Sequence, residues 1–279
     1  MIKLFAMDLD GTLLDNDSKL DKKVIKSLQK LDDEGIKFVF CSGRAKPSVD
    51  YLISLTGFDN PIVANNGAIA SISKENIIYE NYLTYKDMEK LIGYCEEYKL
   101  VYHFYDQKTY YSNRIRPERF KHLKKDSDYG MNYQVNFSFS ENPLDELKKR
   151  KNHAFKFQIF PSEYDPITRD EILKDIKQLN KNLYITSSND RVIEIMQKNV
   201  DKFQAICELC DYLGISKDEI AAIGDGDNDI PMLKGAKMSF AVENANDSVK
   251  DIVDFVVSPN YEFGITEAVD KVIKENKNV

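Results

Sequence analysis

Short apolar runs that stop abruptly at polar residues mark the first part of the chain. Three such runs occupy residues 2–7, 38–41 and 61–64, and they stop at Asp8, Ser42 and Asn65. Continuous apolar runs of this length are typical of strands that are buried on both faces. Apolar positions at helical spacing lie between them, with Asp21 as an expected N-cap and Gly35 as an expected stop. Strands that alternate with helices predict a parallel sheet with right-handed crossovers.

The same alternation returns near the C-terminus. The spacing predicts a helix over residues 201–213, and a capping-box pattern at residues 216–219 precedes a buried strand that ends before Asp225. Further strands are expected at residues 239–242 and 254–257, and a closing helix from about Ile265. Ligands bind outside the carboxyl ends of strands in open parallel sheets, so Asp8, Ser42 and Asp225 are expected to share one site.

Between residues 84 and 190 the pattern changes to aromatic, alternating strands interrupted by helical segments. Asn189 and Asp190 have the composition of a tight hairpin turn between residues 183–187 and 192–196. We interpret residues 84–190 as an α+β domain inserted into a discontinuous α/β core of residues 1–83 and 191–279.

The amino-acid composition limits the classes of protein to which this chain can belong. The chain carries 39 basic and 46 acidic residues, and 42% of its residues are hydrophobic, which is typical of a globular protein. An acidic chain has no general field that attracts phosphate backbones, so no nucleic-acid partner is expected. Without an apolar stretch of about 20 residues, no membrane association is expected and a cytoplasmic location is favoured.

The sequence Asp8-Leu9-Asp10-Gly11-Thr12 places two carboxylates two positions apart just after a buried strand. Strand alternation sends both side chains the same way if the strand geometry persists. One carboxylate can attack phosphorus as a nucleophile, while the other serves as general acid and base. Short acidic turns also occur as plain loops or calcium sites, which this pentapeptide alone leaves open.

A second acidic element, Asp225-Gly-Asp-Asn-Asp229, begins like a calcium-binding EF-hand loop. Such a loop needs Gly at its sixth position and Glu at its twelfth, whereas this chain has Ile230 and Ala236. A hard divalent cation shared by Asp8 and Asp225 is the better explanation. It would offset repulsion of about 4 kcal/mol per charge pair, at roughly 4 Å and an effective dielectric near 20, between a carboxylate and an incoming phosphate.

Ser42 and Lys202 are candidate phosphate ligands, because a strand-end hydroxyl and a lysine at a helix start both favour an anion. Each signal is weak alone, since Ser-Gly turns and surface lysines are common. Arg44 receives no role for the same reason. The four signals follow one another in the order Asp, Ser, Lys, Asp-Asp, and each lies at the end of a predicted strand or helix. A coincidence of all four is a poor explanation.

With these motifs, the sequence resembles the haloacid dehalogenase (HAD) superfamily, and within it the Cof-type phosphatases with a large C2-type α/β cap inserted after the third strand. Three shorter segments also resemble that subfamily: Asn66-Gly67-Ala68, Glu194-Ile195 and Gly264-Ile265. The resemblance spans essentially the whole chain. It implies a Rossmann-like parallel-sheet core and an inserted α+β cap.

The resemblance also implies roles for individual residues. Asp8 would be the nucleophile and Asp10 the general acid and base. Phosphate would be bound by Ser42, the adjacent Gly43, Lys202 and Asn228. Mg²⁺ would be held by Asp8, the Asp10 backbone carbonyl and Asp225, with Asp229 acting through water or as a support.

Two residues depart from the family pattern. Asn199 stands where Gly usually precedes the motif lysine, and Asn best tolerates the left-handed backbone expected there. Glu243 replaces the usual Gly before Asn244, which is expected to alter a loop near the substrate, so Asn244 receives no role.

These expectations favour a Mg²⁺-dependent phosphatase that hydrolyses small phosphorylated metabolites, sugar phosphates among them, through an aspartyl-phosphate. A phosphotransferase or phosphomutase would use the same residues, and a non-enzymatic phosphoaspartate switch is a further alternative that Asp10 disfavours. The inserted domain carries no readable substrate motif. The identity of the substrate and the oligomeric state are therefore left open.

Overall fold

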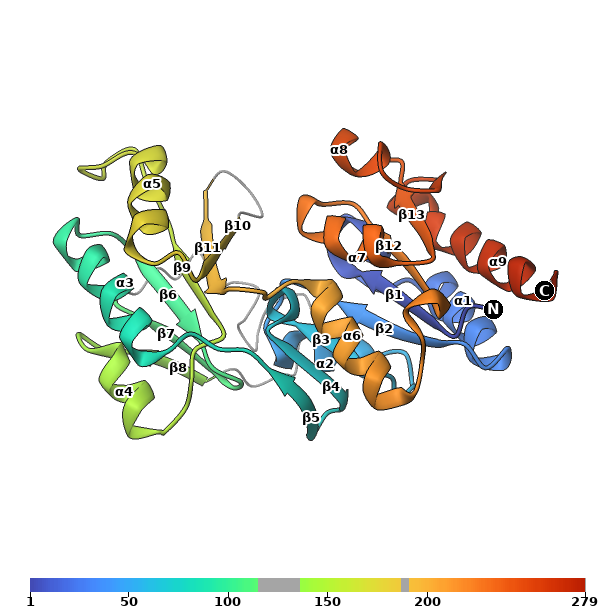
Figure 1. Ribbon diagram of the computed structural model, residues 1–279, viewed down its shortest axis with the longest axis horizontal. Coiled ribbons are helices and arrows are strands. Elements are labelled where there is room, and N and C mark those ends of the chain that lie inside the picture. The colour runs from blue at the N-terminus through green and yellow to red at the C-terminus, as the bar shows by residue number, and fades with distance from the viewer. Residues whose placement is uncertain (115–135, 187–190, 279) are drawn as a thin grey trace. The chain divides into compact units, whose positions relative to one another are not determined.

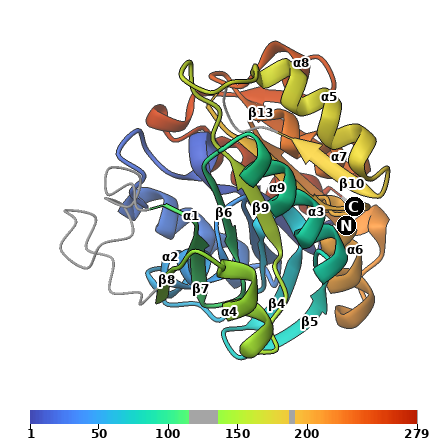
Figure 2. The same cartoon turned by 90° about the vertical axis from the view of Figure 1, so that its left-hand side faces the viewer.

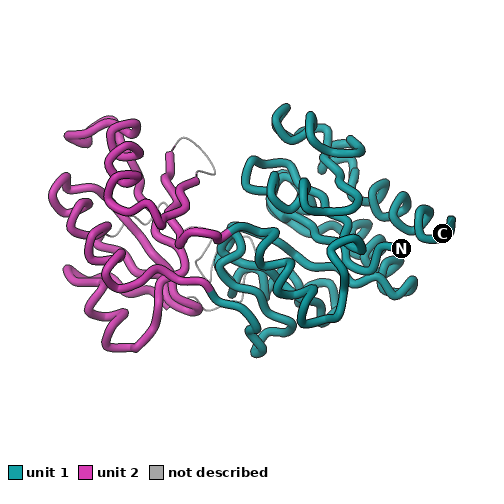
Figure 3. Tube along the Cα trace, in the orientation of Figure 1, with its two compact units in different colours: residues 1–80, 201–279 teal, residues 81–200 magenta. Residues whose placement is uncertain are grey.

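The computed structural model describes residues 1–114, 136–186 and 191–278. They form two units, one of Met1–Glu80 with Asp201–Val279 and one of Asn81–Val200 (Figure 3). The chain leaves the first unit after residue 80 and returns at residue 201, whereas the sequence predicted an exit after residue 83 and a return at residue 191. The later return has a structural reason, because the strand over Ile193–Gln197 pairs within the second unit.

An eight-stranded sheet organises the first unit, in the order β14-β13-β12-β1-β2-β3-β4-β5 (Figure 1). Six strands are parallel, as predicted: β1 Leu4–Asp8, β2 Lys37–Cys41, β3 Ile62–Ala64, β12 Ile220–Gly224, β13 Met238–Val242 and β14 Phe255–Val257. Strand β1 lies at the centre, where Leu4 is opposite Lys37 of β2 and Ile220 of β12. Every side chain of β1 is buried, which explains its continuous apolar sequence.

A hairpin that the sequence did not reveal extends this sheet beyond β3. Strands β4 (Ile69–Ser73) and β5 (Asn76–Glu80) are antiparallel to their neighbours. The second unit is therefore inserted after this hairpin, two strands later than the expected third strand. The register of the hairpin shifts near Ser71, so strict alternation is lost.

Helices lie on both sides of the sheet, with α1 and α6 on opposite sides (Figures 1 and 2). Helix α1 packs against α9, and α6 packs against α7. The bounds of the helices are α1 Lys22–Asp33, α2 Lys46–Ser54, α6 Lys202–Leu213, α7 Ile230–Gly235, α8 Asp247–Lys250 and α9 Gly264–Lys277. The caps agree with the sequence: the Asp21 carboxylate accepts the Lys23 N–H at 2.7 Å, and Ser216 and Glu219 form a capping box.

The second unit is a six-stranded sheet in the order β10-β11-β9-β6-β7-β8. Its strands are β6 Tyr102–Tyr105, β7 Thr109–Ser112, β8 Asn136–Phe139, β9 Lys156–Ile159, β10 Leu183–Thr186 and β11 Ile193–Gln197. Helices α3 (Tyr85–Glu97), α4 (Pro143–Lys149) and α5 (Arg169–Leu179) cover one face and bury its aromatic and aliphatic side chains (Figure 1). Strands β10 and β11 are antiparallel as predicted, while the turn expected at Asn189 and Asp190 lies outside the described residues.

Among the described helices of both units, none has the length and apolar composition that crossing a membrane requires.

One glycine makes a close contact that fixes the start of α6. Gly67 has a left-handed φ of +102°, and a Cβ built on it would lie 2.1 Å from the backbone oxygen of Asp201. Gly35 also has a left-handed φ, +73°, but a Cβ there would meet no heavy atom of the described chain within 4 Å.

We expect Gly67→Ala to lower the free energy of unfolding by about 3 kcal/mol, because strain from the left-handed backbone adds to a backbone collision. The matched control, Gly35→Ala, adds only the backbone strain and should cost about 1 kcal/mol. Urea denaturation of both variants measures the difference. Equal losses would show that the packing of Gly67 against Asp201 contributes nothing.

Candidate active site

The carboxyl ends of the parallel strands bring distant residues to one edge of the first unit. Asp8 ends β1, Ser42 follows β2, and Asp225 follows β12. Strands β1 and β12 are neighbours, and the strand order runs outward from them in opposite directions, toward β3 and toward β14. Crevices for ligands form at such a reversal. The sequence prediction that these three residues lie at one sheet edge is confirmed.

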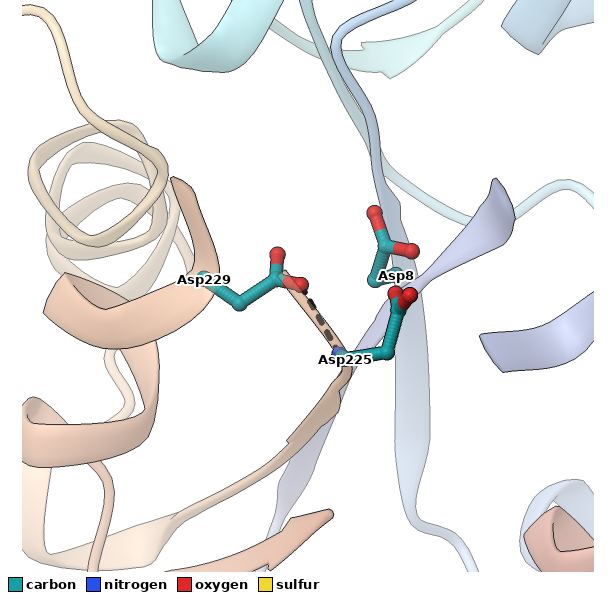
Figure 4. A group of neighbouring side chains, drawn as sticks. All are labelled: Asp8, Asp225 and Asp229. Atoms are coloured by element: carbon teal, nitrogen blue, oxygen red, sulfur yellow. Dashed lines mark hydrogen bonds between the residues drawn. The ribbon is translucent and has the colours of Figure 1, made fainter. Parts of the chain in front are cut away.

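Three carboxylates meet at this point (Figure 4). One oxygen from each of Asp8, Asp225 and Asp229 lies within 4.8 Å of the others. Asp229 is held by its own loop, because its Oδ2 accepts the backbone N–H groups of Asp225 and Gly226, both at 3.0 Å. Thr12 Oγ1 donates to Asp225 Oδ1 at 3.0 Å and joins the turn after β1 to the same group.

Lys202 supplies the positive charge of this cluster. It is the first residue of α6 and completely buried, and its Nζ donates at 2.5 Å to Asp8 Oδ1 and to Asp229 Oδ1. Burial opposes the charged ammonium, but Asp229 and Asp8 outweigh it and raise the pKa of Lys202 above its usual range. Lys202 therefore stays protonated between two carboxylates.

The carboxylates themselves are held in an environment that disfavours their ionisation. Burial, and then the charge of Asp229, raise the pKa of Asp8 well above its usual value despite Lys202. Burial and Asp229 also raise the pKa of Asp225 to about 6. When all three carboxylates are ionised, one ammonium leaves excess negative charge, and every ligand atom that they offer is an oxygen. This donor set suits a hard divalent cation such as Mg²⁺.

Asp10 does not join the carboxylate cluster. Its side chain is half-exposed and forms a two-point ion pair with Arg44, in which Arg44 Nε donates to Asp10 Oδ2 at 2.8 Å. The turn over Leu9–Leu13 departs from strand geometry, with Gly11 at a φ of +85°. The metal contact expected through the Asp10 backbone carbonyl stays a prediction.

The expected phosphate ligands form a connected loop network beside the carboxylates. Ser42 is buried, its N–H donates to Val63 O, and its carbonyl accepts the Asn66 N–H at 2.9 Å. A Cβ on Gly43 would lie 2.8 Å from Asn66 Oδ1, so Gly43 lets the loop approach Asn66 closely. Asn228 Nδ2 donates to Asn66 Oδ1 at 3.2 Å, which connects the loops after β2, β3 and β12.

Sequence reasoning missed the structural roles of Asn66 and Asn244. Asn66 has a left-handed φ of 57° and bridges Ser42 to Asn228. Asn244 Nδ2 donates to Gly11 O at 2.8 Å, and its Oδ1 accepts the Asn260 N–H at 2.8 Å. Asn244 therefore holds the turn after β1 although Glu243 precedes it. Asn66 belongs to the segment Asn66-Gly67-Ala68 that resembles the family, but its hydrogen-bond partners Ser42 and Asn228 lie in other parts of the sequence.

The backbone of Asn199 has the left-handed conformation that the sequence predicted. Its φ is 64°, the left-handed conformation that asparagine tolerates better than most residues. Asp201 then caps α6 by accepting the Gln204 N–H at 2.8 Å. The short segment from residue 199 to residue 202 thus turns the chain and delivers Lys202 to the carboxylates.

A parallel α/β core whose central strand ends in a buried aspartate, beside a buried lysine and an acidic loop, is the arrangement expected of hydrolases that act on phosphate esters. The chain belongs to the haloacid dehalogenase-like hydrolases, whose family model matches residues 5–269. This confirms the resemblance stated from the motifs.

Similar proteins match this chain over nearly its whole length and over nearly their own. A phosphoglycolate phosphatase of Sulfolobus acidocaldarius is 30% identical over 98% of this chain and 97% of its own. The 5-amino-6-(5-phospho-D-ribitylamino)uracil phosphatase YcsE of Bacillus subtilis is 26% identical over 96% of this chain and 94% of its own. A haloacid dehalogenase-like hydrolase from Bacteroides thetaiotaomicron, 23% identical, shares the fold with a TM-score of 0.81 over 98% of this chain and 100% of its own.

The raised carboxyl pKa values predict how stability depends on pH and metal. In the metal-free protein, Asp225 has a folded-state pKa of about 6, against 3.8 for an unperturbed group. The folded state then binds more protons than the unfolded state, so stability falls as pH rises between these values. A divalent cation bound by the ionised carboxylates would relieve that loss.

We therefore expect Mg²⁺ to raise the melting temperature more at about pH 7.5 than at about pH 5, because protons compete for the carboxylates at the lower pH. Thermal denaturation with EDTA or with Mg²⁺, at matched ionic strength, measures the shift. A shift of the same size at both pH values would contradict metal binding by these carboxylates.

Proposed function

We propose that this protein is a Mg²⁺-dependent phosphomonoesterase for small phosphorylated metabolites that acts through an aspartyl-phosphate on Asp8. The observation that carries the proposal is the position of Asp8, at the end of the central strand, beside Asp225 and Asp229 and in contact with Lys202. Membership of a hydrolase family supports the reaction class. The phosphatase names of two relatives support a phosphate ester as substrate.

The reaction takes two displacements at phosphorus. In the first, a carboxylate oxygen of Asp8 forms a bond to phosphorus while the bond to the ester oxygen breaks, and Asp10 gives its proton to the departing oxygen. In the second, water attacks phosphorus, Asp10 accepts a proton from it, and the bond to Asp8 breaks. Inorganic phosphate leaves and both aspartates return to their starting states.

Positive and polar groups of the same edge bind the transferred phosphate. Lys202 offers an ammonium to its oxygens, and Ser42 and the N–H of Gly43 offer hydrogen bonds from the loop after β2. Asn228 orients its amide through Asn66. Asp8, Asp225 and the Asp10 carbonyl would hold Mg²⁺, with Asp229 as a direct or supporting ligand. When bound, the cation offsets repulsion between Asp8 and the phosphate dianion.

The two N-terminal aspartates should differ in the step that they support. We expect Asp8→Asn to abolish turnover and covalent phosphoenzyme together. Asp10→Asn should slow hydrolysis of alkyl phosphates by about 10² to 10⁴-fold, and a phosphoenzyme formed from an aryl phosphate should persist longer. Phosphate release and intact-protein mass spectrometry after quenching measure the two quantities.

Asp17→Asn is the matched control, because the Asp17 carboxylate is 77% exposed and lies in the same N-terminal region. It should keep the wild-type rate, and excess EDTA should stop that rate until Mg²⁺ is added. A substantial rate for Asp8→Asn would overturn the nucleophile assignment. Transfer of phosphate to a sugar rather than to water would favour a phosphotransferase or phosphomutase.

We further propose that the second unit, residues 81–200, acts as the cap that selects the substrate. All the proposed catalytic and phosphate-binding side chains belong to the first unit. The two relatives share phosphatase names but carry different substrate names, phosphoglycolate and a ribitylaminouracil phosphate, which suits a common core with a variable selecting element.

Replacing residues 81–200 with a short Gly/Ser linker should therefore preserve cleavage of a small aryl phosphate but reduce discrimination among metabolite phosphates. Strand β5 contacts α6, so the two ends of the core lie on packed elements. Circular dichroism first establishes that the shortened chain folds. Specificity constants for both classes of ester are then compared with those of the full chain. An unchanged ranking of metabolites would place specificity in the core loops.

A further inference from the structure

Arg44 forms a two-point ion pair with Asp10, the residue that is proposed to transfer protons. Its Nε donates to Asp10 Oδ2 at 2.8 Å, and a terminal nitrogen of the same guanidinium donates to Asp10 Oδ1. The Arg44 side chain is 18% exposed, whereas that of Asp10 is 50% exposed. Both oxygens of Asp10 thus accept hydrogen bonds from one guanidinium, a pairing that is strong and specific in direction.

The backbone of Arg44 is fixed within the phosphate-binding loop. The Arg44 N–H donates to Ser42 Oγ at 3.1 Å, and the Arg44 carbonyl accepts the Asn65 N–H at 2.9 Å. Arg44 is therefore two residues from Ser42 on a loop that is held at both ends, while its guanidinium reaches the turn after β1. Arg44 therefore links Ser42, a proposed phosphate ligand, to Asp10, the proposed general acid and base.

We propose that Arg44 is a phosphate-binding and positioning residue, whose guanidinium exchanges the Asp10 carboxylate for the phosphate of the substrate. A guanidinium fork matches a carboxylate and a phosphate equally well in geometry, and the phosphate dianion carries the larger charge. The exchange releases both oxygens of Asp10 when a phosphate is bound. This inference rests on the proposed phosphatase function.

The exchange ties the availability of Asp10 to the presence of substrate. While Asp10 is paired with Arg44, neither of its carboxylate oxygens is placed to give a proton to a leaving group. When phosphate takes the guanidinium, the Asp10 carboxylate is released. No covalent bond is made or broken in this exchange, since one ion pair replaces another. The released carboxylate then takes from solvent the proton that it gives to the leaving group.

A double-mutant cycle on phosphate binding tests the exchange without turnover. Inorganic phosphate is titrated calorimetrically into the full-length, Mg²⁺-saturated wild type, Asp10→Asn, Arg44→Gln and the double variant. Asp10→Asn removes the competitor for the guanidinium and should tighten phosphate binding by about fivefold. The same substitution in the Arg44→Gln background should change binding by less than about twofold, because only direct repulsion is relieved.

Asp270→Asn is the matched control for the loss of one negative charge. Asp270 forms an exposed ion pair with Lys30 at 2.7 Å, in which it is 57% exposed, and it lies on α9. Its substitution should leave the phosphate dissociation constant within about 1.5-fold of the wild type, as expected for a screened surface charge.

Equal gains from Asp10→Asn in both backgrounds would overturn the exchange and leave Arg44 as a brace for Asp10. If Arg44→Gln does not fold, Arg44→Lys replaces it, because lysine keeps the charge but cannot form the two-point pair, and the coupling should again be lost. Hydrolysis of a phosphate ester by the wild type is measured separately. Coupling without hydrolysis would reject the proposed function alone, and hydrolysis without coupling would reject the exchange alone.

Discussion

The ammonium of Lys202, bound between the carboxylates of Asp8 and Asp229, is the interaction on which the arrangement of the site depends. Two buried carboxylates about 4 Å apart repel each other by roughly 4 kcal/mol at an effective dielectric near 20. Removing charges from water adds a further cost of several kcal/mol for each ion. One buried cation between them offsets part of this cost, and it lets Asp8 and an acidic loop occupy one strand end.

Much of the surrounding structure serves to bring that ammonium to its position. Asn199 turns the chain in a left-handed conformation, Asp201 caps the helix, and Gly67 allows the neighbouring turn to approach. On the other side, Asp229 is fixed by two backbone N–H groups of its own loop. The lysine therefore meets carboxylates that are already oriented, so little conformational freedom remains to be lost when a ligand arrives.

The elements and the strand-end residues were predictable because their signals are local. Strands buried on both faces leave continuous apolar runs, and caps such as Asp21 and Ser216 act within a few residues. Asp8, Ser42 and Asp225 were placed at one edge because parallel strands present their carboxyl ends there, and Lys202 was singled out because it begins a predicted helix.

The remaining features depend on contacts between distant segments. Asp10 pairs with Arg44, which lies 34 positions away, and the turn at Gly11 departs from the strand geometry on which the expected direction of its side chain depended. The bridging role of Asn66 requires Asn228, which is 162 positions away. The hairpin of β4 and β5 lacks strict alternation, and β11 belongs to the second unit because it pairs with β9 and β10.

The pairing of β1 with β12 has a consequence for how the chain acquires its structure. Thr12 and Asp225, which hydrogen-bond beside these strands, are 213 positions apart, so the central strand gains one of its two neighbours only late in synthesis. A long insertion between paired strands adds little to the entropy of closure, which grows only with the logarithm of loop length. It does slow folding, because contacts of high sequence separation form slowly. The inserted unit has its own apolar core and can fold before the first unit is complete, whereas the carboxylate cluster can form only once Asp225 and Asp229 have been synthesised.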